Sequence, residues 1–191
     1  MDADALFDLN HAAHRRVFDA LVALRPAVGR AGARLANTLA EGGKLIFFGN
    51  GGSACDAQHI AAELTGRLKH ERRPLPALSL NSDVAALTAI GNDYGYDEVF
   101  ARPLAALGRP GDCVVALSTS GRSPNVLRAL RVARESGLYT VALLGRDGGT
   151  ARTLAEHAIV VDDEDSARIQ EAHIFIGHTW CGQIEHALAL V

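Results

Sequence analysis

KLIFFGNGGSACDAQHIAAELTGRL (Lys44–Leu68) contains an apolar run, a glycine-rich turn and a helical pattern, in that order. The apolar run Lys44–Phe48 predicts a buried strand. Glycines interrupt it, and the residues from about Ala54 to Leu68 predict a helix. A strand that turns through glycines into a helix is the repeating unit of a parallel α/β sheet, so this segment predicts the fold class.

The same alternation of strand and helix continues toward the C-terminus without a linker, a low-complexity tract or an internal repeat. Four further strands are expected at Ala77–Leu80, Cys113–Ser118, Tyr139–Gly145 and Ala158–Val161. Helices are expected near Asp83–Ile90, up to Leu107, and over Pro124–Ser136, Thr150–Glu156 and Ser166–Leu190, with a loop at Gly91–Asp97. This alternation predicts one domain, residues 1–191, with a three-layer α/β fold on a five-stranded parallel sheet.

Residues 4–41 precede the first strand and show the helical spacing of apolar residues. Pro26 marks a kink or boundary and Gly42-Gly43 ends the pattern, so we expect an N-terminal helical hairpin. Because these helices come before the sheet begins, they cannot be crossovers within it. Their apolar stripe is expected either to cover one face of the sheet or to pack against another subunit.

The composition suits a single large core and excludes several classes of protein. Of 191 residues, 48% are hydrophobic and only 5% aromatic, which favours small aliphatic side chains packed between helices and a parallel sheet. The 19 basic and 22 acidic residues give a net charge of −3 without a basic run, so no nucleic-acid partner is expected. The chain shows no signal-peptide pattern, no apolar stretch of about 18 residues, and three isolated cysteines. We therefore expect a reduced, cytoplasmic protein with no membrane partner.

Two loops at the expected carboxyl ends of strands have the composition of an anion site, and ligands of open parallel sheets bind at such ends. The first, Gly49–Ala54, formally matches the dinucleotide fingerprint GxGxxA. The second strand, however, ends in ALSLNSD, without the acidic residue that would hold a ribose, and no GK[ST] follows as in a Walker-type loop. Glycine N–H groups and a helix N-terminus would instead capture an anion, with Ser53 adding a hydroxyl donor.

The second loop, Ser118–Pro124, places four hydroxyl groups within seven residues before a helix. One serine or threonine there would be an ordinary N-cap, but four exceed what capping requires. Neutral donors in this number suit a phosphate monoester that is bound and released, so the loop predicts a phosphorylated small-molecule ligand.

Candidate metal ligands lie on two helices. His59 and Glu63 are four residues apart on one helix face, which is a common half-site for a divalent metal and also a common surface hydrogen bond. The last helix carries Gln170, His173 and His178, and spacing alone leaves open which histidine would face the first pair. Surface or structural roles are expected for the remaining histidines: His11, His14, His70, His157 and His186.

Four blocks of the sequence together resemble the phosphoheptose isomerases, a family with the sugar-isomerase (SIS) fold. They are GNGGSACDAQHIAAELTGR (Gly49–Arg67), AIGNDYGYDEVFAR (Ala89–Arg102), STSGRSPNV (Ser118–Val126) and RIQEAHIFIGH (Arg168–His178). The blocks occur in the family's order, and the similarity covers nearly the whole chain, whereas STSGxS alone marks only the broad fold. The resemblance implies a flavodoxin-like sheet and a homotetramer in which neighbouring subunits share sites and residues 1–42 serve assembly.

The resemblance also implies the site residues. One Zn²⁺ per subunit would be held by His59, Glu63, Gln170 and His178. Substrate contacts are implied for Asn50, Gly51, Gly52, Ser53, Glu63, Asn92, Asp93, Ser118, Thr119, Ser120, Ser123 and Gln170. Some members carry an acid two residues before the isoleucine of RIQE, where this chain has Ala167.

The implied activity is the isomerisation of sedoheptulose 7-phosphate to D-glycero-D-manno-heptose 7-phosphate, which supplies nucleotide-activated heptose for lipopolysaccharide and other surface polysaccharides. Moving a proton between adjacent carbons through an enediol requires an acid–base pair and a positive charge near the oxyanion. Glu63 and His178 are the implied pair, and zinc would polarise the sugar oxygens. Two alternatives stay open: a non-catalytic SIS protein that binds the bacterial replication initiator, and an isomerase or sensor for another phosphosugar.

Overall fold

Five parallel strands form the centre of the protein in a computed structural model that describes residues 2–191. The strands are β1 (Leu45–Gly49), β2 (Ala77–Ser79), β3 (Cys113–Ser118), β4 (Tyr139–Gly145) and β5 (His157–Val161). Their order is β2-β1-β3-β4-β5, with every neighbouring pair parallel, which is the flavodoxin-like order. The predicted sheet is thus confirmed.

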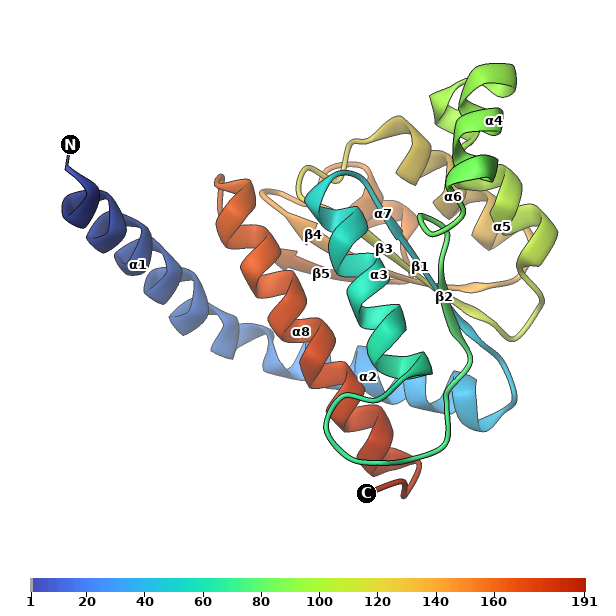
Figure 1. Ribbon diagram of the computed structural model, residues 1–191, viewed down its shortest axis with the longest axis horizontal. Coiled ribbons are helices and arrows are strands. Elements are labelled where there is room, and N and C mark those ends of the chain that lie inside the picture. The colour runs from blue at the N-terminus through green and yellow to red at the C-terminus, as the bar shows by residue number, and fades with distance from the viewer. Residues whose placement is uncertain (1) are drawn as a thin grey trace.

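Helices cover both faces of the sheet and give the predicted three layers (Figure 1). The first face packs against α2 (Arg25–Ala40), α3 (Gly52–Thr65) and α8 (Ser166–Ala187), and the second against α5 (Ala101–Leu107), α6 (Pro124–Glu135) and α7 (Ala151–Leu154). Successive strand residues point to opposite faces, so Phe47 joins the first core and Phe48 the second. Both faces are apolar because both are covered.

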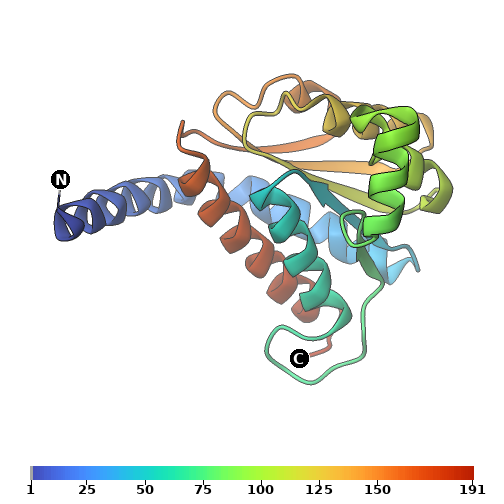
Figure 2. The same cartoon turned by 45° about the horizontal axis from the view of Figure 1, so that its top comes forward.

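The N-terminal segment is not the predicted hairpin. α1 (Ala3–Ala20) passes through a 3₁₀ turn, Leu21–Leu24, directly into α2, so the two helices follow one another as a bent rod (Figures 1 and 2). Pro26 lies in the first turn of α2, where its fixed φ suits a helix and its missing N–H would have no helical partner. The proline therefore begins a helix instead of reversing the chain.

The two halves of this rod have different surroundings. α2 buries Val28, Leu35 and Leu39 against the sheet, which agrees with the expectation that the N-terminal helices cover one of its faces. α1 projects away from the body, and its side chains Leu6 and Phe7 are 51% and 69% exposed. The apolar stripe of α1 is therefore left uncovered at its N-terminal part, whereas Val17 near its C-terminal end is buried.

The segment expected to be a loop at Gly91–Asp97 is mostly helical. α4 runs from Val84 to Tyr94, capped at its start by the Asp83 carboxylate, and Gly95 ends it at φ +89°. A 3₁₀ turn, Tyr96–Glu98, follows. The expectation was wrong because the helix continues through Gly91 and is stopped only where a glycine adopts a left-handed conformation. α4 has no buried residue of its own.

α3 and α8 lie side by side along a seam that carries most of the predicted ligands (Figures 1 and 2). Gly177 of α8 faces Ile60 of α3 so closely that an added Cβ would lie 2.6 Å from Ile60 Cγ1. Nearer the start of α3, a Cβ on Gly52 would lie 2.6 Å from both polar atoms of the Gln170 amide. These close approaches fix how the two helices are rotated and shifted relative to each other. Within residues 2–191, none of the helices combines the length and the apolar composition that a membrane span requires.

Candidate metal and phosphosugar site

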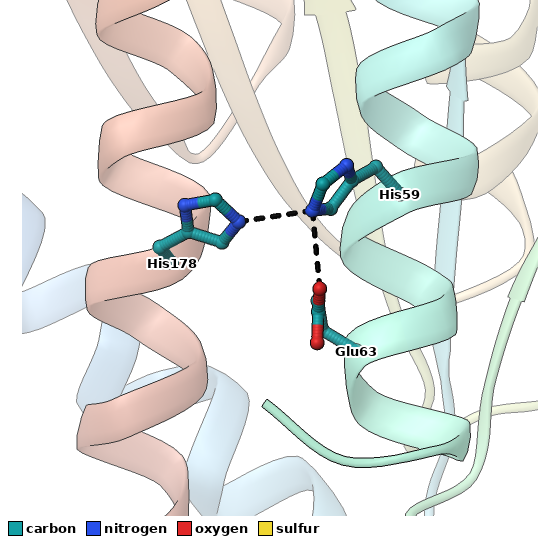
Figure 3. Close-up of side chains that lie close together, drawn as sticks. All are labelled: His59, Glu63 and His178. Atoms are coloured by element: carbon teal, nitrogen blue, oxygen red, sulfur yellow. Dashed lines mark hydrogen bonds and ion pairs between the residues drawn. The ribbon is translucent and has the colours of Figure 1, made fainter. Parts of the chain in front are cut away.

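Three potential metal ligands converge across the α3–α8 seam (Figure 3). His59 Nε2 lies 3.0 Å from His178 Nε2 and 3.1 Å from Glu63 Oε1. One ligand atom from each of the three side chains lies within 4.8 Å of the others. His59 and Glu63 face α8 together because they are one turn apart on α3, and His178 reaches them from α8.

The ambiguity between the two histidines of the last helix is resolved by burial. His173 is completely buried on the sheet side of α8, and its Nε2 pairs with the Leu144 carbonyl oxygen at 3.1 Å. Burial lowers the pKa of His173 to about 4, so this ring stays neutral at physiological pH. His173 is therefore a core residue, while His178 faces α3.

The other histidines lie outside the cluster. His14 pairs with Glu171 at 2.9 Å, and His157 pairs with the Ala27 carbonyl oxygen at 2.9 Å. Within the described part of the chain, His59, Glu63 and His178 form the one group of at least three histidine, cysteine, aspartate or glutamate side chains whose ligand atoms all lie within 4.8 Å of one another.

The donor set suits zinc. Two imidazole nitrogens and one carboxylate oxygen are ordinary zinc ligands, and two atoms bound at about 2.0–2.1 Å to a tetrahedral ion lie roughly 3.3–3.4 Å apart. The observed separations of 3.0 and 3.1 Å are close to that spacing. Both of these separations involve His59, and the third, between Glu63 and His178, is at most 4.8 Å, so the three side chains fit the donor set of a candidate zinc site.

Gln170, the fourth implied ligand, lies two turns before His178 on α8. Its amide rests against the backbone of Gly52 at the start of α3, rather than in a contact with the three converging side chains. Gln170 therefore lies beside the glycine turn after β1.

A small recess of about 50 Å³ opens at the carboxyl ends of β1 and β3. It is lined by Asn50, Ser53, Leu117, Ser118, Thr119 and Ser123. Ser53 and Ser118 are only 3% and 5% exposed. The helices α3 and α6 begin here, and neither has a side-chain cap at its N-terminus. The positive ends of both helices therefore point toward the recess.

The remaining predicted contacts are placed less centrally. Ser120 Oγ accepts the Arg122 N–H at 3.2 Å, which orders the loop rather than lining the recess. Asn92 and Asp93 lie on exposed α4, where the Asn92 amide donates to the Asp93 carboxylate at 2.8 Å. Within residues 2–191, neither α4 side chain belongs to the cluster or lines the recess.

Comparison with known proteins agrees with this geometry. Residues 10–145 match the SIS domain model. A phosphoheptose isomerase of Pelobacter propionicus is 52% identical over 176 residues, which is 91% of this chain and 93% of that protein. The chain belongs to the phosphoheptose isomerase family.

Solved structures of this family have the same fold. The phosphoheptose isomerase of Francisella tularensis is 34% identical, with a TM-score of 0.94 over 97% of this chain and 100% of that chain. The one from Neisseria gonorrhoeae is 42% identical, with a TM-score of 0.85 over 96% of each chain. The resemblance noted in the sequence is confirmed, and these relatives favour the isomerase over the initiator-binding alternative.

The sequence did not reveal two residues of this member of the phosphoheptose isomerase family that bind Asn50 beside the recess. Asn125 is 2% exposed, and its amide forms a reciprocal pair with that of Asn50, with both hydrogen bonds at 2.9 Å. The Tyr96 hydroxyl donates to Asn50 Oδ1 at 3.1 Å. The signal for Asn125 was a polar residue at the second position of α6, which was hidden by the serines before it. Tyr96 had no local signal because its partner is 46 residues away.

Asp56 is a third missed residue, one turn before His59 on α3. Its Oδ2 is buried without a hydrogen-bond partner among the described residues. Burial raises the pKa of Asp56 to about 6, and the charge of nearby His59 partly opposes this effect. The cluster of His59, Glu63 and His178 thus has a further carboxyl group near His59, and the pKa of this carboxyl group is raised toward neutral pH.

Proposed function

We propose that this member of the family interconverts sedoheptulose 7-phosphate and D-glycero-D-manno-heptose 7-phosphate. The observation that carries the proposal is the convergence of His59, Glu63 and His178 on one point of the α3–α8 seam. Such a cluster gives a carboxylate and an imidazole at hydrogen-bonding distance from a common centre, as acid–base catalysis on a sugar requires.

The proposed chemistry uses Glu63 and His178 as the acid–base pair. One of them removes the proton from the carbon next to the carbonyl while the other protonates the carbonyl oxygen, which gives an enediol. The enediol hydroxyl on the first carbon then loses its proton, and the former carbonyl carbon gains one. Glu63 is half-buried, with a side-chain exposure of 23%, which limits competition from water. Asp93 is a reserve candidate for ring opening or for positioning a hydroxyl group.

The phosphate would occupy the recess lined by Ser53, Ser118 and Thr119 together with Asn50 and Ser123. Ser120 would contribute by ordering the loop, or contact the phosphate after a rotation of its side chain. Backbone N–H groups of Gly51 and Gly52 at the start of α3 would add donors. Ser53 precedes His59 by six residues on α3, a rise of about 9 Å. This distance is of the order of an extended sugar phosphate, which supports a substrate lying along the helix.

Zinc is the proposed ion, one per subunit, held by His59, Glu63 and His178 with Gln170 as the fourth ligand after a rotation of its side chain. When bound, the ion would polarise the carbonyl and hydroxyl oxygens of the sugar and stabilise negative charge on them.

A homotetramer is the proposed assembly, with Asn92 and Asp93 contributed to a neighbouring subunit's site. Two helices support it. α1 exposes an apolar stripe, and α4 exposes Val84 to 69% without burying any residue of its own. Exposed apolar faces of this kind mark protein interfaces. The mass of the particle in solution, measured by light scattering, tests this proposal, and a monomer would refute it.

The proposed setting is the cytoplasm, where the product would enter the synthesis of nucleotide-activated heptose for surface polysaccharides. The direct test is conversion of sedoheptulose 7-phosphate by zinc-loaded protein, followed with a heptose-phosphate kinase. Glu63→Gln and His178→Gln should each lower kcat by at least about 10²-fold, the scale of one acid or base.

Matched controls are available on the same elements of the chain. His186→Gln makes the same replacement on α8 at an exposed position, and Glu71→Gln does so for an exposed glutamate just beyond α3. Both should retain activity near that of the unmodified chain. Absence of turnover by the unmodified zinc-loaded protein would reject the assignment, and turnover of a hexose or pentose phosphate instead would redirect it to another phosphosugar.

A further inference from the structure

A buried ion pair lies at the C-terminal end of the α3–α8 seam and has no part in the chemistry described so far. Arg72, in the loop after α3, donates from Nε to Glu185 Oε1 of α8 at 3.0 Å. The two side chains are 1% and 3% exposed, so this pair is far more deeply buried than the other ion pairs of residues 2–191. Withdrawing two charges from water is costly, and such pairs often add little net stability.

The rest of the Arg72 guanidinium binds the end of α3. Its Nη2 donates to the Glu63 carbonyl oxygen at 2.7 Å, and its Nη1 donates to those of Leu64 and Gly66 at 2.8 and 2.9 Å. These carbonyls belong to the last turn of α3, where no further helical N–H groups are available. A planar, rigid fork of donors thus fixes the turn that carries Glu63.

Glu185 ties the same fork to the opposite helix. It lies seven residues after His178, so the two side chains differ by only about 20° around α8 and share one face. The buried thiol of Cys181 lies between them in sequence, and its pKa is raised to about 12 by burial first and by the carboxylates of Glu63 and Glu185 next. Arg72 therefore links the backbone of Glu63 to the face of α8 that carries His178.

We propose that the Arg72–Glu185 pair is a positioning device that holds Glu63 and His178 at ligand separation across the seam. This inference rests on the proposed metal centre, because its effect is exerted through the ligands. Neither residue belongs to the three-residue cluster or lines the recess. The planar fork, rather than its positive charge alone, is the essential feature, since only a guanidinium reaches both the carboxylate and three carbonyls.

The test measures binding of Zn²⁺ alone, by competition with a chromophoric chelator, and the absorption spectrum of the Co²⁺ form. Arg72→Lys keeps the charge but loses the fork, and Glu185→Gln removes the partner charge. Each should weaken Zn²⁺ binding by about 10-fold or more, as loss of residues that orient metal ligands does. The Co²⁺ spectrum should change because the ligand geometry is altered.

Lys44→Met is the matched control. It breaks the Lys44–Asp112 pair, which is joined at 2.5 Å just before the amino ends of β1 and β3, with side chains 25% and 5% exposed. This variant should unfold at a lower temperature in the metal-free state, yet bind Zn²⁺ and give a Co²⁺ spectrum like the unmodified chain. If the single seam variants do not fold, Arg72→Met combined with Glu185→Leu removes both charges together, and the same loss of affinity is expected.

The outcomes separate the two proposals. Zn²⁺ affinity within about threefold of the unmodified chain in a folded seam variant, well below the loss expected for orienting residues, would overturn the positioning role alone. An unmodified chain that binds no Zn²⁺ would overturn the metal centre and this inference with it. An equal loss of affinity in Lys44→Met would show a general effect of stability and would also overturn the positioning role.

Discussion

Gly177→Ala places one methyl group in the α3–α8 seam and should separate stability from site geometry. The added Cβ would lie 2.6 Å from Ile60 Cγ1, whereas carbon atoms in contact prefer about 3.5–4.0 Å. Ile60 is 1% exposed, so it has little space into which to move. The helices must therefore separate by roughly 1 Å, beside His59 on one helix and His178 on the other.

The expected magnitude combines two opposing effects. Overpacking costs about 1–3 kcal/mol, and replacing a helical glycine by alanine returns about 0.5–1 kcal/mol. The difference is a net loss of roughly 0–2.5 kcal/mol, which should lower Tm by at most about 10 °C for a domain of this size. A 1 Å displacement of catalytic groups can lower kcat by about 10²-fold, so activity should fall far more than stability.

Gly182→Ala is the matched control on the same helix, because nothing lies within 4 Å of its added Cβ. This variant should be more stable than the unmodified chain by about 0.5–1 kcal/mol and should keep its activity. Tm is measured by calorimetry on the metal-free protein, and kcat by the coupled isomerase assay on the zinc-loaded protein. If Gly177→Ala were as stable and as active as Gly182→Ala, the view that close packing at Gly177 sets the ligand geometry would be refuted.

Two further predictions concern the core and the phosphate loop. His173 has a pKa of about 4 when folded, against about 6.5 when unfolded. The unfolded state thus binds more protons between these values, and the free energy of unfolding should fall by about 3 kcal/mol from pH 7 to pH 4. Urea unfolding across this range should show a smaller fall for His173→Gln, and identical pH profiles would contradict the assignment. Gly121 and Gly137 both have positive φ, +62° and +71°. A Cβ added at Gly121 would lie 2.5 Å from the carbonyl carbon of Gly148, whereas a Cβ added at Gly137 would have nothing within 4 Å. Gly137→Ala should lose only the roughly 1–2 kcal/mol of stability that strain at positive φ costs. Gly121→Ala should lose more stability and also raise KM, because the phosphate-binding loop is packed against the backbone of Gly148. Equal Tm and KM values for the two variants would refute the importance of this packing.

Local patterns were sufficient wherever a feature depends on one element. The strands near Lys44–Phe48 and Cys113–Ser118 were predicted within a residue because each is an apolar run bounded by glycine or polar residues. His59 and Glu63 were paired correctly because i and i+4 share a helix face whatever the helix packs against. The alternation of elements also fixed the parallel sheet.

Errors arose where a local signal has two meanings. Pro26 can end one helix or begin the next, and here it begins α2, so a hairpin was predicted where a bent rod exists. Gly91 lies within α4, and only Gly95 ends it, because a glycine stops a helix when it adopts positive φ and not merely by its presence.

The sequence alone determined the fold class, the two candidate anion-binding loops and one half of the candidate metal cluster, since each follows from spacing along a single element. The tertiary structure decided that His178 and not His173 faces α3, that Asn125 joins Asn50, and that Arg72 joins Glu185. The physical reason is that periodicity gives the relative directions of side chains on one helix, but not the rotation of that helix against its neighbour. That rotation is set by close packing, as at Gly177 against Ile60.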